Sequence, residues 1–393
     1  MASITARALN RATLARQGLL DPLTTSAAEA VDRLGSLQAQ HPEWPPVALA
    51  ARAAGAATAD LAGALERRAV VRSSLMRLTI HVVAAGDLWP MFAVCQPLRL
   101  NQWRLLMKAD PRTSALGKRM MAAHPAAIAA LRERPRSSLE IDRIISEEVG
   151  PGATSVSRPA GRDSDARVVV RASWRHFSAF LPLVHVPHDG EGYGRSRYAL
   201  ATDWLGEQRP EVDEGDARTY LARRYLAAFG PASVEDLIAY VGRGKAGVVA
   251  AWRHALTALG DEVVTMNDES GRTLYDLEHA PRPPADTHAS PRLIARWDSL
   301  LLSHATRHRG RVISDEHRPR VFSKNADVLP TILVDGTVSG TWELLRRDGR
   351  ADITLRPFRR MVGRNRAGLE AEAYRILALI APDHTDHIVT FAA

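Results

Sequence analysis

Residues 262–277, EVVTMNDESGRTLYDL, contain the clearest β-hairpin signal of the chain, because two β-branched, apolar runs flank the polar turn 267–271. Three helices are predicted ahead of this hairpin. They cover 216–229, a segment capped by Ser233, and 245–259. Three helices followed by a hairpin are the layout of a winged helix, in which one helix enters a DNA groove while the hairpin touches the backbone.

The same order of helices and strands occurs twice more, less clearly, in the N-terminal half. The first copy ends in the β-rich run 70–83, and the second ends in the strands 183–186 and 198–200 around a glycine-rich tip, 187–195. The helices expected in these copies are 10–20, 26–39, 58–67, 137–149 and one through Trp174 and Phe177. The pattern therefore predicts two further winged helices.

A proline-rich linker, 280–284, separates this part from a region of different pattern. The segments 331–334, 337–342 and 352–357 alternate as strands, and 369–380 has the spacing of a helix. We expect an α+β protein with three tandem winged-helix domains followed by a C-terminal β-barrel-like domain, which is either a small β-barrel or a curled sheet with a covering helix. The predicted boundaries are 1–120, 121–207, 208–280 and 281–393, with a basic, DNA-facing segment in the last domain.

Length and composition restrict the class of protein. With 393 residues, 46% of them apolar, the chain can bury hydrophobic cores, which excludes a disordered protein. The single cysteine, Cys95, excludes an intrachain disulfide, and no apolar run reaches the ~18 residues of a membrane helix. The first residues lack the layout of a signal peptide. We expect a cytoplasmic protein without membrane contact.

The formal net charge of +8 attracts phosphate groups. Only four of the 52 basic residues are lysines, and GC-rich codons alone also produce an arginine-rich chain, so the total charge leaves nucleic-acid binding open. The distribution is more specific, because residues 291–366 contain sixteen basic and eight acidic side chains, a surplus equal to the net charge of the chain. This clustering favours a DNA-binding surface over a solvated arginine-rich face.

Metal and nucleotide sites lack their usual patterns. One cysteine forbids a cysteine-rich zinc site, and His304 and His308 lack the glutamate of a zinc-protease helix. The glycine-rich run 242–247 precedes a helix but lacks P-loop spacing, so a plain turn is favoured over a phosphate site. We expect neither a metal nor a cofactor.

Two glutamines, Gln38 and Gln40, form the most informative polar pair. Helical periodicity puts Gln38 on the apolar face of the predicted helix 26–39, where an amide needs partners. Pro42 disfavours the helical conformation at His41, so the helix should finish near Gln40 with both amides in one cleft. The alternative is a helix-end pair bonded to backbone groups, and the residues alone leave both interpretations open.

The stretch RSSLMRLTIH, residues 72–81, interleaves Arg72, Ser74 and Thr79 with apolar positions. This pattern is typical of a half-buried strand that presents polar groups on one side. An ordinary wing strand explains it equally well.

A second polar stretch follows the linker, where Trp297-Asp298 precedes His304 and the arginines Arg307, Arg309 and Arg311. It is either a cluster of ion pairs at a domain junction or a basic prong for phosphates. We favour the prong because the stretch lies in the basic segment.

Five stretches together resemble the AlkZ/YcaQ-like winged-helix DNA glycosylases. They run in the expected order over nearly the whole chain: LNRATLA (9–15), LQAQ (37–40), RSSLMRLTIH (72–81), WDSLLLSH (297–304), and LVDG (333–336) with GTW (340–342). The resemblance implies three winged helices and a β-rich domain around a basic channel for duplex DNA. It also implies excision of N7- or N3-alkylated purines and, in the AlkZ-like branch, the unhooking of interstrand crosslinks made by genotoxic natural products, a form of self-resistance.

The resemblance assigns catalysis to Gln38 and Gln40. The AlkZ-like branch carries Gln-hydrophobic-Gln, whereas the YcaQ-like branch has Asp at the second position, so Gln40 places this chain in the AlkZ-like branch. Thr306 stands where relatives often have Asp, and Ala295 where a proline often precedes the Trp-Asp pair. The expected DNA contacts are Arg72, Ser74, Arg77, His81, Trp297, Arg307, Arg309, Arg311 and Lys324.

Two neutral amides suit this chemistry. Alkylation at N7 gives the purine a positive charge, so the base leaves without a general acid. Glutamine carbonyl oxygens can hold a water and place a negative dipole near the developing oxocarbenium-like sugar. Lys108, Lys118 and Lys245 lie outside every motif, so we expect a monofunctional enzyme that forms no amine intermediate.

The expected partner is double-stranded DNA with alkylated bases, bound by a nucleoid-associated monomer. A crosslinked base cannot swing into a deep pocket, so unhooking requires a shallow, open site. The alternative function is a non-catalytic winged-helix transcriptional regulator, which binds undamaged DNA through base-edge contacts. Three non-identical winged helices in one chain argue against it.

Overall fold

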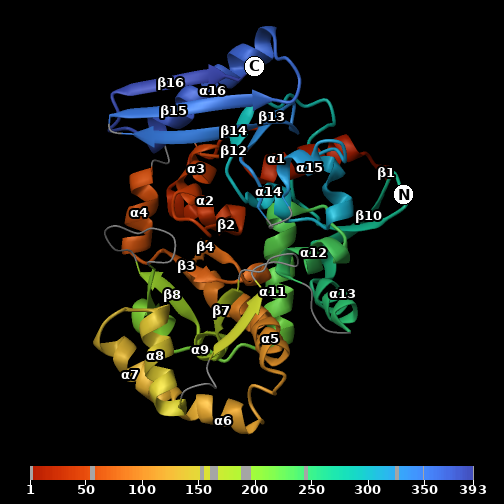
Figure 1. The fold of residues 1–393 in the computed structure, drawn as a ribbon. Helices are drawn as coiled ribbons and strands as arrows, with labels where there is room; N and C mark the ends of the chain where they lie inside the picture. Colours follow the sequence, from red (N-terminus) through yellow and green to blue (C-terminus); the bar gives the residue numbers. More distant parts are fainter. Residues whose placement is uncertain are drawn as a thin grey trace.

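The computed structural model shows a mixed α+β fold (Figure 1), with strands in four sheets among the described residues. The residues that the structure describes are 3–53, 58–150, 155–159, 167–186, 196–242, 247–323, 327–347 and 349–392. Within these ranges, no helix is long and apolar enough to cross a membrane.

The hairpin predicted at 262–277 is confirmed, and it closes a three-helix unit. Strands β10 (Val263–Asp268) and β11 (Thr273–Leu277) pair antiparallel. The helices before them are α11 (Glu214–Phe229), α12 (Val234–Val241) and α13 (Val248–Ala258). A capping box of Ser233 and Asp236 begins α12. The N-terminal strand β1 (Ser3–Ile4) adds to β10 in parallel and ties the chain start to this unit.

The strand pairs of the first two predicted copies belong to one six-stranded sheet of order β2-β4-β3-β8-β9-β5. Its strands are β2 (Leu37–Gln38), β3 (Val70–Ser74), β4 (Ile80–Ala84), β5 (Arg136–Ser137), β8 (Leu183–Val186) and β9 (Arg197–Leu200). The halves join where Ser73 of β3 pairs with Val184 of β8. The first two copies therefore share a sheet, and this topology does not establish them as separate winged helices. The tip 187–195 lies outside the described residues.

The helix predicted at 26–39 is wrong in its second half. Helix α2 covers Ala27–Leu34 and ends at Gly35, whose φ of 77° interrupts the helix. The chain then enters β2, which pairs with β4. The glutamine segment is therefore extended backbone beside a sheet, and its position depends on a partner strand about forty residues away.

Helix α5 (Leu88–Met107) connects the six-stranded sheet with the rest of this half. It packs against α11 and against α9 (Ala172–Phe180). Trp89, Phe92 and Cys95 lie in a core shared with α11 and α13. The other helices of the N-terminal half are α1 (Ala6–Arg16), α3 (Trp44–Ala50), α4 (Thr58–Glu66), α6 (Ala115–Ala122), α7 (His124–Glu133), α8 (Ser138–Val149) and α10 (Ala201–Leu205). Strands β6 (Ser155–Pro159) and β7 (Arg167–Arg171) form a separate antiparallel pair.

The C-terminal strands form an open sheet of order β12-β13-β14-β15-β16, so the predicted β-barrel is wrong. The strands are β12 (Arg292–Ile294), β13 (Thr331–Val334), β14 (Thr337–Arg347), β15 (Arg350–Pro357) and β16 (Asp386–Phe391). Helix α16 (Gly363–Ile380) carries the chain from β15 to β16, which pair in parallel. A parallel pair needs such a crossover, and β16 thereby becomes an edge strand instead of returning to β12.

The first helices and the C-terminal sheet share one hydrophobic core. Leu34 and Trp44 lie in it together with Trp342, Ile353 and Leu377. The rings of Trp44 and Trp342 meet edge to face with centroids 6.0 Å apart. The segment 37–41 joins α2 to α3, and both helices pack in this core against the C-terminal sheet and α16.

Candidate active site

Gln38 is held by an arginine at the end of the six-stranded sheet. Its backbone pairs with His81 of β4, and the residue is only 8% exposed. Arg77 donates from Nη2 to Oε1 of Gln38 at 3.0 Å and from Nη1 to the carbonyl oxygen of Tyr240 at 2.7 Å. The guanidinium group thus fixes the amide of Gln38 and ties it to helix α12 through a charge-assisted hydrogen bond.

Gln40 is held by the backbone of β4. Its Oε1 accepts a hydrogen bond from the amide of Ile80 at 3.3 Å, while the amide of Ala39 donates to the carbonyl oxygen of Ile80 at 2.7 Å. Arg72 donates from Nε to the carbonyl oxygen of Ala39 at 3.2 Å and is itself buried. The side chain of Gln40 therefore takes the place of a backbone acceptor opposite Ile80.

The turn that carries Arg77 is conformationally strained. Arg77 and Leu78 have φ angles of 53° and 57°, in the left-handed region that non-glycine residues rarely adopt. Residues in this region persist only where the surrounding structure holds them, and they are common at functional sites. The strain here aims the guanidinium group at Gln38.

His81 supports Arg77 from within the sheet. Its Nδ1 lies 3.0 Å from the carbonyl oxygen of Thr79, and its Nε2 lies 3.3 Å from Nη2 of Arg77. Burial and the charge of Arg77 lower the pKa of His81 to about 3. The ring is therefore neutral, with Nδ1 as the donor and Nε2 as the acceptor. Since His81 is buried, the structure places it behind the site and not on a DNA-facing surface.

The two glutamines face different spaces. Gln40 and Ser74 line a cavity of about 460 Å³ between the sheet, α5 and α9. Gln38 instead lines a small space beside Arg52 and Asp298. The structure thus brings both amides to the edge of β4 but not into a single cleft.

Trp297 is a predicted DNA contact, and it lies next to the glutamine segment. Its ring stacks on His41, the residue after Gln40, with centroids 5.1 Å apart and planes at 18°. Its φ of 54° is a third strained backbone angle near the site. Asp298 instead forms a buried ion pair with Arg52, 2.6 Å between Oδ1 and Nη2. Asp298 is therefore part of an ion pair, as in the domain-junction interpretation, whereas Trp297 lies beside the glutamine segment.

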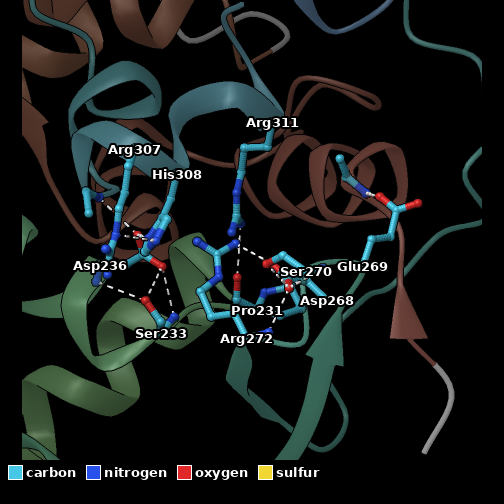
Figure 2. Close-up of polar contacts among 12 residues, drawn as sticks. Pro231, Ser233, Asp236, Asp268, Glu269, Ser270, Arg272, Arg307, His308 and Arg311 are labelled. Carbon is cyan, nitrogen blue, oxygen red and sulfur yellow. Dashed lines mark hydrogen bonds and ion pairs between the residues drawn. The ribbon is translucent and has the colours of Figure 1, made fainter. Parts of the chain in front are cut away.

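The arginines after Trp297 are placed differently from one another (Figure 2). Arg307 is exposed and forms an ion pair with Glu235 on α12. Arg311 is only 4% exposed, and its Nη1 donates to the carbonyl oxygen of Pro231 at 3.0 Å. We leave Arg311 out of the proposed DNA-binding surface because its side chain points into the protein.

Among Arg307, Arg309 and Arg311, Arg309 has the charge of Arg77 close to it. It donates from Nε to the carbonyl oxygen of His304 at 3.2 Å and lies over the ring of Phe322 at 4.9 Å. Burial and the charges of Arg77 and Arg318 lower the pKa of Arg309 to about 10. It stays protonated at neutral pH and adds positive charge close to Arg77. Lys324, the last predicted contact, lies outside the described residues.

Comparison with known proteins identifies the family of this chain. The sequence model of a family described as DNA glycosylase AlkZ-like matches residues 31–379, a range that includes both glutamines and Trp297. The chain belongs to this family. An AlkZ-like family member is an enzyme that acts as a DNA glycosylase, so the alternative of a non-catalytic regulator is set aside.

A curated relative and a solved structure, both from Streptomyces sahachiroi, agree with this assignment. The interstrand DNA cross-link repair glycosylase of Streptomyces sahachiroi is 24% identical over 334 residues, which cover 84% of this chain and 85% of the relative. The solved structure of the S. sahachiroi DNA glycosylase AlkZ matches with a TM-score of 0.77 and 19% identity over 100% of both chains. At that identity, the structural match shows that the two proteins share a fold.

Three residues of this AlkZ-like site were not predicted from the sequence. His41 directly follows the glutamine motif, and this adjacency is a signal that could have identified it. Arg52 and Tyr240 carry no such signal. Tyr240 contributes its backbone carbonyl to Arg77, and a backbone carbonyl is available at every position of a chain.

Proposed function

We propose that the protein is a monofunctional DNA glycosylase that hydrolyses the N-glycosidic bond of N7- or N3-alkylated purines, with Gln38 and Gln40 as its catalytic residues. The observation that supports this best is the Gln38–Arg77–His81 chain, because a part-buried arginine on a strained turn fixes the neutral amide of Gln38. Fixed dipoles are effective in catalysis because they need no reorganisation during the reaction.

The reaction needs little chemical help from the protein. The bond between C1′ and N9 breaks, and its electron pair moves to the base, whose positive charge is cancelled. A water oxygen bonds to C1′ and releases one proton to solvent, so the products are an abasic site and a neutral base. The enzyme must hold the water and stabilise the positive sugar, as in other glycosidic cleavage.

Among the described residues, each glutamine oxygen accepts one hydrogen bond and keeps a second acceptor position for this task. An amide oxygen carries two lone pairs, and one is used by Arg77 at Gln38 and by the amide of Ile80 at Gln40. We assign the attacking water to Gln40, because its side chain is partly exposed and lines the larger cavity. Gln38 then supplies a fixed dipole at the sugar.

Several further features are part of the proposal. The curated S. sahachiroi relative is named for interstrand cross-link repair, and we extend crosslinks and bulky natural-product adducts to this chain as candidate substrates. Neither Lys108 nor Lys118 lines the cavity beside Gln40, which fits a monofunctional mechanism. We also propose that the α11–α13 unit with its β10–β11 hairpin acts as a winged helix on duplex DNA, bound by a monomer.

The DNA-facing surface is proposed to contain Ser74, Trp297 and Arg309, with Arg307 at its rim. Ser74 and Trp297 flank the glutamine segment, and Arg309 adds charge next to Arg77. Arg72, Arg77 and His81 instead hold the glutamine segment from behind. Lys324 remains a prediction from the basic segment.

Incubation with duplex DNA that contains one N7-methylguanine tests the proposal. We expect release of free 7-methylguanine and a strand that stays intact until alkali cleaves the abasic site. An intact substrate after prolonged incubation counts against the glycosylase assignment for this lesion, and immediate strand cleavage counts against a monofunctional mechanism.

A further inference from the structure

Tyr240 contacts the surroundings of the glutamine segment through more than its backbone. It lies on α12, which packs against the turn 76–78 that carries Arg77. Its hydroxyl group lies 2.9 Å from Oγ of Ser36, and its carbonyl oxygen accepts the 2.7 Å hydrogen bond from Arg77. Ser36 comes directly before β2, the strand that carries Gln38. One residue of α12 therefore contacts both the residue before the glutamine segment and the arginine that holds Gln38.

The carbonyl contact caps the C-terminal end of α12. This helix ends at Val241, so the carbonyl group of Tyr240 lies in the last turn, where carbonyl groups have no amide donor within the helix. Arg77 supplies a donor, and its positive charge is favourable beside the partial negative charge of a helix C-terminus. The guanidinium group also lies over the ring of Tyr240, 5.5 Å from the centroid, which adds a cation–π contact. The position of Arg77, and with it that of the Gln38 amide, therefore depends on Tyr240.

The hydroxyl contact restrains the start of the glutamine segment. Ser36 follows Gly35, where α2 has ended, and precedes β2. Ser36 and Tyr240 are each only 1% exposed, so their hydrogen bond is shielded from water. Burial raises the pKa of Tyr240 to about 12, so its hydroxyl group keeps its proton at neutral pH and can donate to Ser36. Because β2 has only two residues, a buried side-chain hydrogen bond beside it contributes to its position.

We propose that Tyr240 is a positioning residue for Gln38. The inference rests on the proposed function and extends its machinery to α12. The hydroxyl group of Tyr240 fixes the chain before Gln38 through Ser36. Its carbonyl oxygen and ring fix Arg77, which holds the Gln38 amide. A preorganised dipole is effective only while its orientation is held, so these contacts act on kcat through Gln38. Because Tyr240 is buried, its side chain is not placed to contact DNA.

Removal of the hydroxyl group tests the contact with Ser36. Tyr240→Phe keeps the ring and the backbone carbonyl group, so Arg77 keeps its partners and only the hydrogen bond to Ser36 is lost. We expect kcat for excision of N7-methylguanine to fall about three- to tenfold, the range for loss of one hydrogen bond, with a change in KM below about twofold. Ser36→Ala removes the same bond from the other side and should reduce kcat by a similar factor.

A double-mutant cycle separates this contact from general damage to the fold. The variant with both Tyr240→Phe and Ser36→Ala should lose about as much kcat as either single variant, because the two changes remove one shared hydrogen bond. Losses that multiply in the double variant overturn the inference, since they show that the two hydroxyl groups act independently. A change in KM alone also overturns it and assigns Tyr240 to DNA binding.

Tyr225→Phe is the matched control. Tyr225 lies in the same core, with its ring centroid 5.0 Å from that of Tyr240, and it is also 1% exposed. Its hydroxyl group donates at 2.9 Å to the carbonyl oxygen of Ser303, a residue outside the glutamine segment. Tyr225→Phe should lower the melting temperature about as much as Tyr240→Phe but leave kcat unchanged. An equal loss of kcat in both variants shows a general effect of core stability and overturns the inference.

Hydrogen–deuterium exchange of the full-length protein tests the positioning without an activity measurement. The amide of Ala39 donates to the carbonyl oxygen of Ile80, so its exchange reports how firmly the glutamine segment is held against β4. Exchange in residues 36–41 should be at least about threefold faster in Tyr240→Phe than in the wild-type protein, and unchanged in Tyr225→Phe. Unchanged exchange in Tyr240→Phe overturns the inference whether or not the protein excises N7-methylguanine. Absence of excision by the wild-type protein, in contrast, refutes the proposed function for this lesion.

Discussion

The glutamine site and the basic segment 291–366 treat arginine in opposite ways. At the site, the single guanidinium group of Arg77 meets neutral acceptors, Gln38, His81 and the Tyr240 carbonyl oxygen. In the basic segment, arginines are paired with carboxylates, as in Arg292–Glu372, Arg296–Asp327, Arg307–Glu235, Arg318–Asp315, Arg350–Asp352, Arg356–Glu343 and Arg359–Glu316. Arg77 thus keeps neutral partners where the chemistry is proposed, whereas each of these seven arginines has a carboxylate partner.

This contrast limits what net charge can indicate. The surplus of eight positive charges in 291–366 already counts the carboxylates of that segment, but the pairing of Arg292 with Glu372, the pairing of Arg307 with Glu235 and the burial of Arg311 reduce the field that DNA would meet there. A single arginine such as Arg77 has more influence on the site because its partners are neutral and its surroundings exclude water. The contrast can be tested by changing one group at a time in each region.

The largest effect is expected from the glutamines themselves. Gln38→Ala and Gln40→Ala should each reduce excision of N7-methylguanine by about 10²- to 10³-fold, the usual cost of removing a preorganised dipole from an active site. Affinity for the duplex should change less than about twofold, since neither amide carries a charge. Single-turnover kinetics and an electrophoretic binding assay measure the two quantities.

Gln208→Ala provides the control, because this glutamine is exposed and lies outside the glutamine segment and its hydrogen-bond partners. It should leave both quantities unchanged. Full activity in both glutamine variants would show that the catalytic assignment is wrong.

A smaller loss is expected at Arg77, which positions Gln38 without touching DNA. Arg77→Met removes a charge-assisted hydrogen bond of ~1.5–3 kcal/mol, so kcat should fall by roughly 10- to 100-fold with little change in KM. Arg77→Lys should restore little, since an ammonium group cannot reach both the Gln38 and Tyr240 oxygens in a fork. Arg253→Met serves as the control on an exposed arginine.

An effect of Arg77→Met on KM alone would contradict the positioning role and assign Arg77 to DNA binding. The pair of measurements therefore distinguishes the two functions that an arginine can have at this site.

Local signals predicted the elements whose determinants lie close together in sequence. The 262–277 hairpin and the capping box of Ser233 and Asp236 are present because turn and cap residues act over a few positions. Strand β2 was missed because two residues carry no period, and its partner β4 begins at Ile80. The prediction that the C-terminal sheet closes into a barrel was wrong, because the parallel pairing of β15 with β16 depends on α16 and has no signature in the strands themselves.

The candidate site divides in the same way. Gln38 and Gln40 could be predicted as candidate site residues because their motif is short and contiguous. The contact of Arg77 with Gln38 could not be predicted, because it depends on a left-handed turn and on the backbone carbonyl group of Tyr240. His81 and Arg311 are predicted DNA contacts whose side chains are buried, because alternation along a strand or a charge in a segment does not show which face the tertiary structure covers.

Acid should destabilise both regions through buried neutral histidines. The pKa is lowered to about 3 for His81, mainly by burial and Arg77, and to about 3 for His304, mainly by burial and Arg311. The unfolded chain binds these protons below its ordinary pKa of ~6.5 while the folded protein does not, so stability falls as the pH decreases from there. Each residue should contribute at most about 1.4 kcal/mol per pH unit.

Urea unfolding at a series of pH values measures this slope. His81→Gln and His304→Gln should each reduce it by the equivalent of about one proton, although they lie in different regions. His254→Gln, an exposed histidine, should leave the slope unchanged. A free energy of unfolding that stays constant in acid would show that these rings are not held neutral.

The smallest effects are expected in the basic segment, where two neighbouring arginines differ in their partners. Arg309 lies near Arg77 and has a neutral carbonyl and the ring of Phe322 as its partners, whereas Arg307 is paired with Glu235. Arg309→Gln should weaken duplex binding severalfold and reduce the slope of log affinity against log salt by about 1, the value for one lost phosphate contact. Arg307→Gln should change affinity less than about twofold, because Glu235 occupies the guanidinium group of Arg307 and exposed pairs contribute little. If the two variants weaken binding equally, pairing with a carboxylate does not determine which arginines contact DNA. The glutamine site and the basic segment would then differ only in where their arginines lie relative to the glutamines.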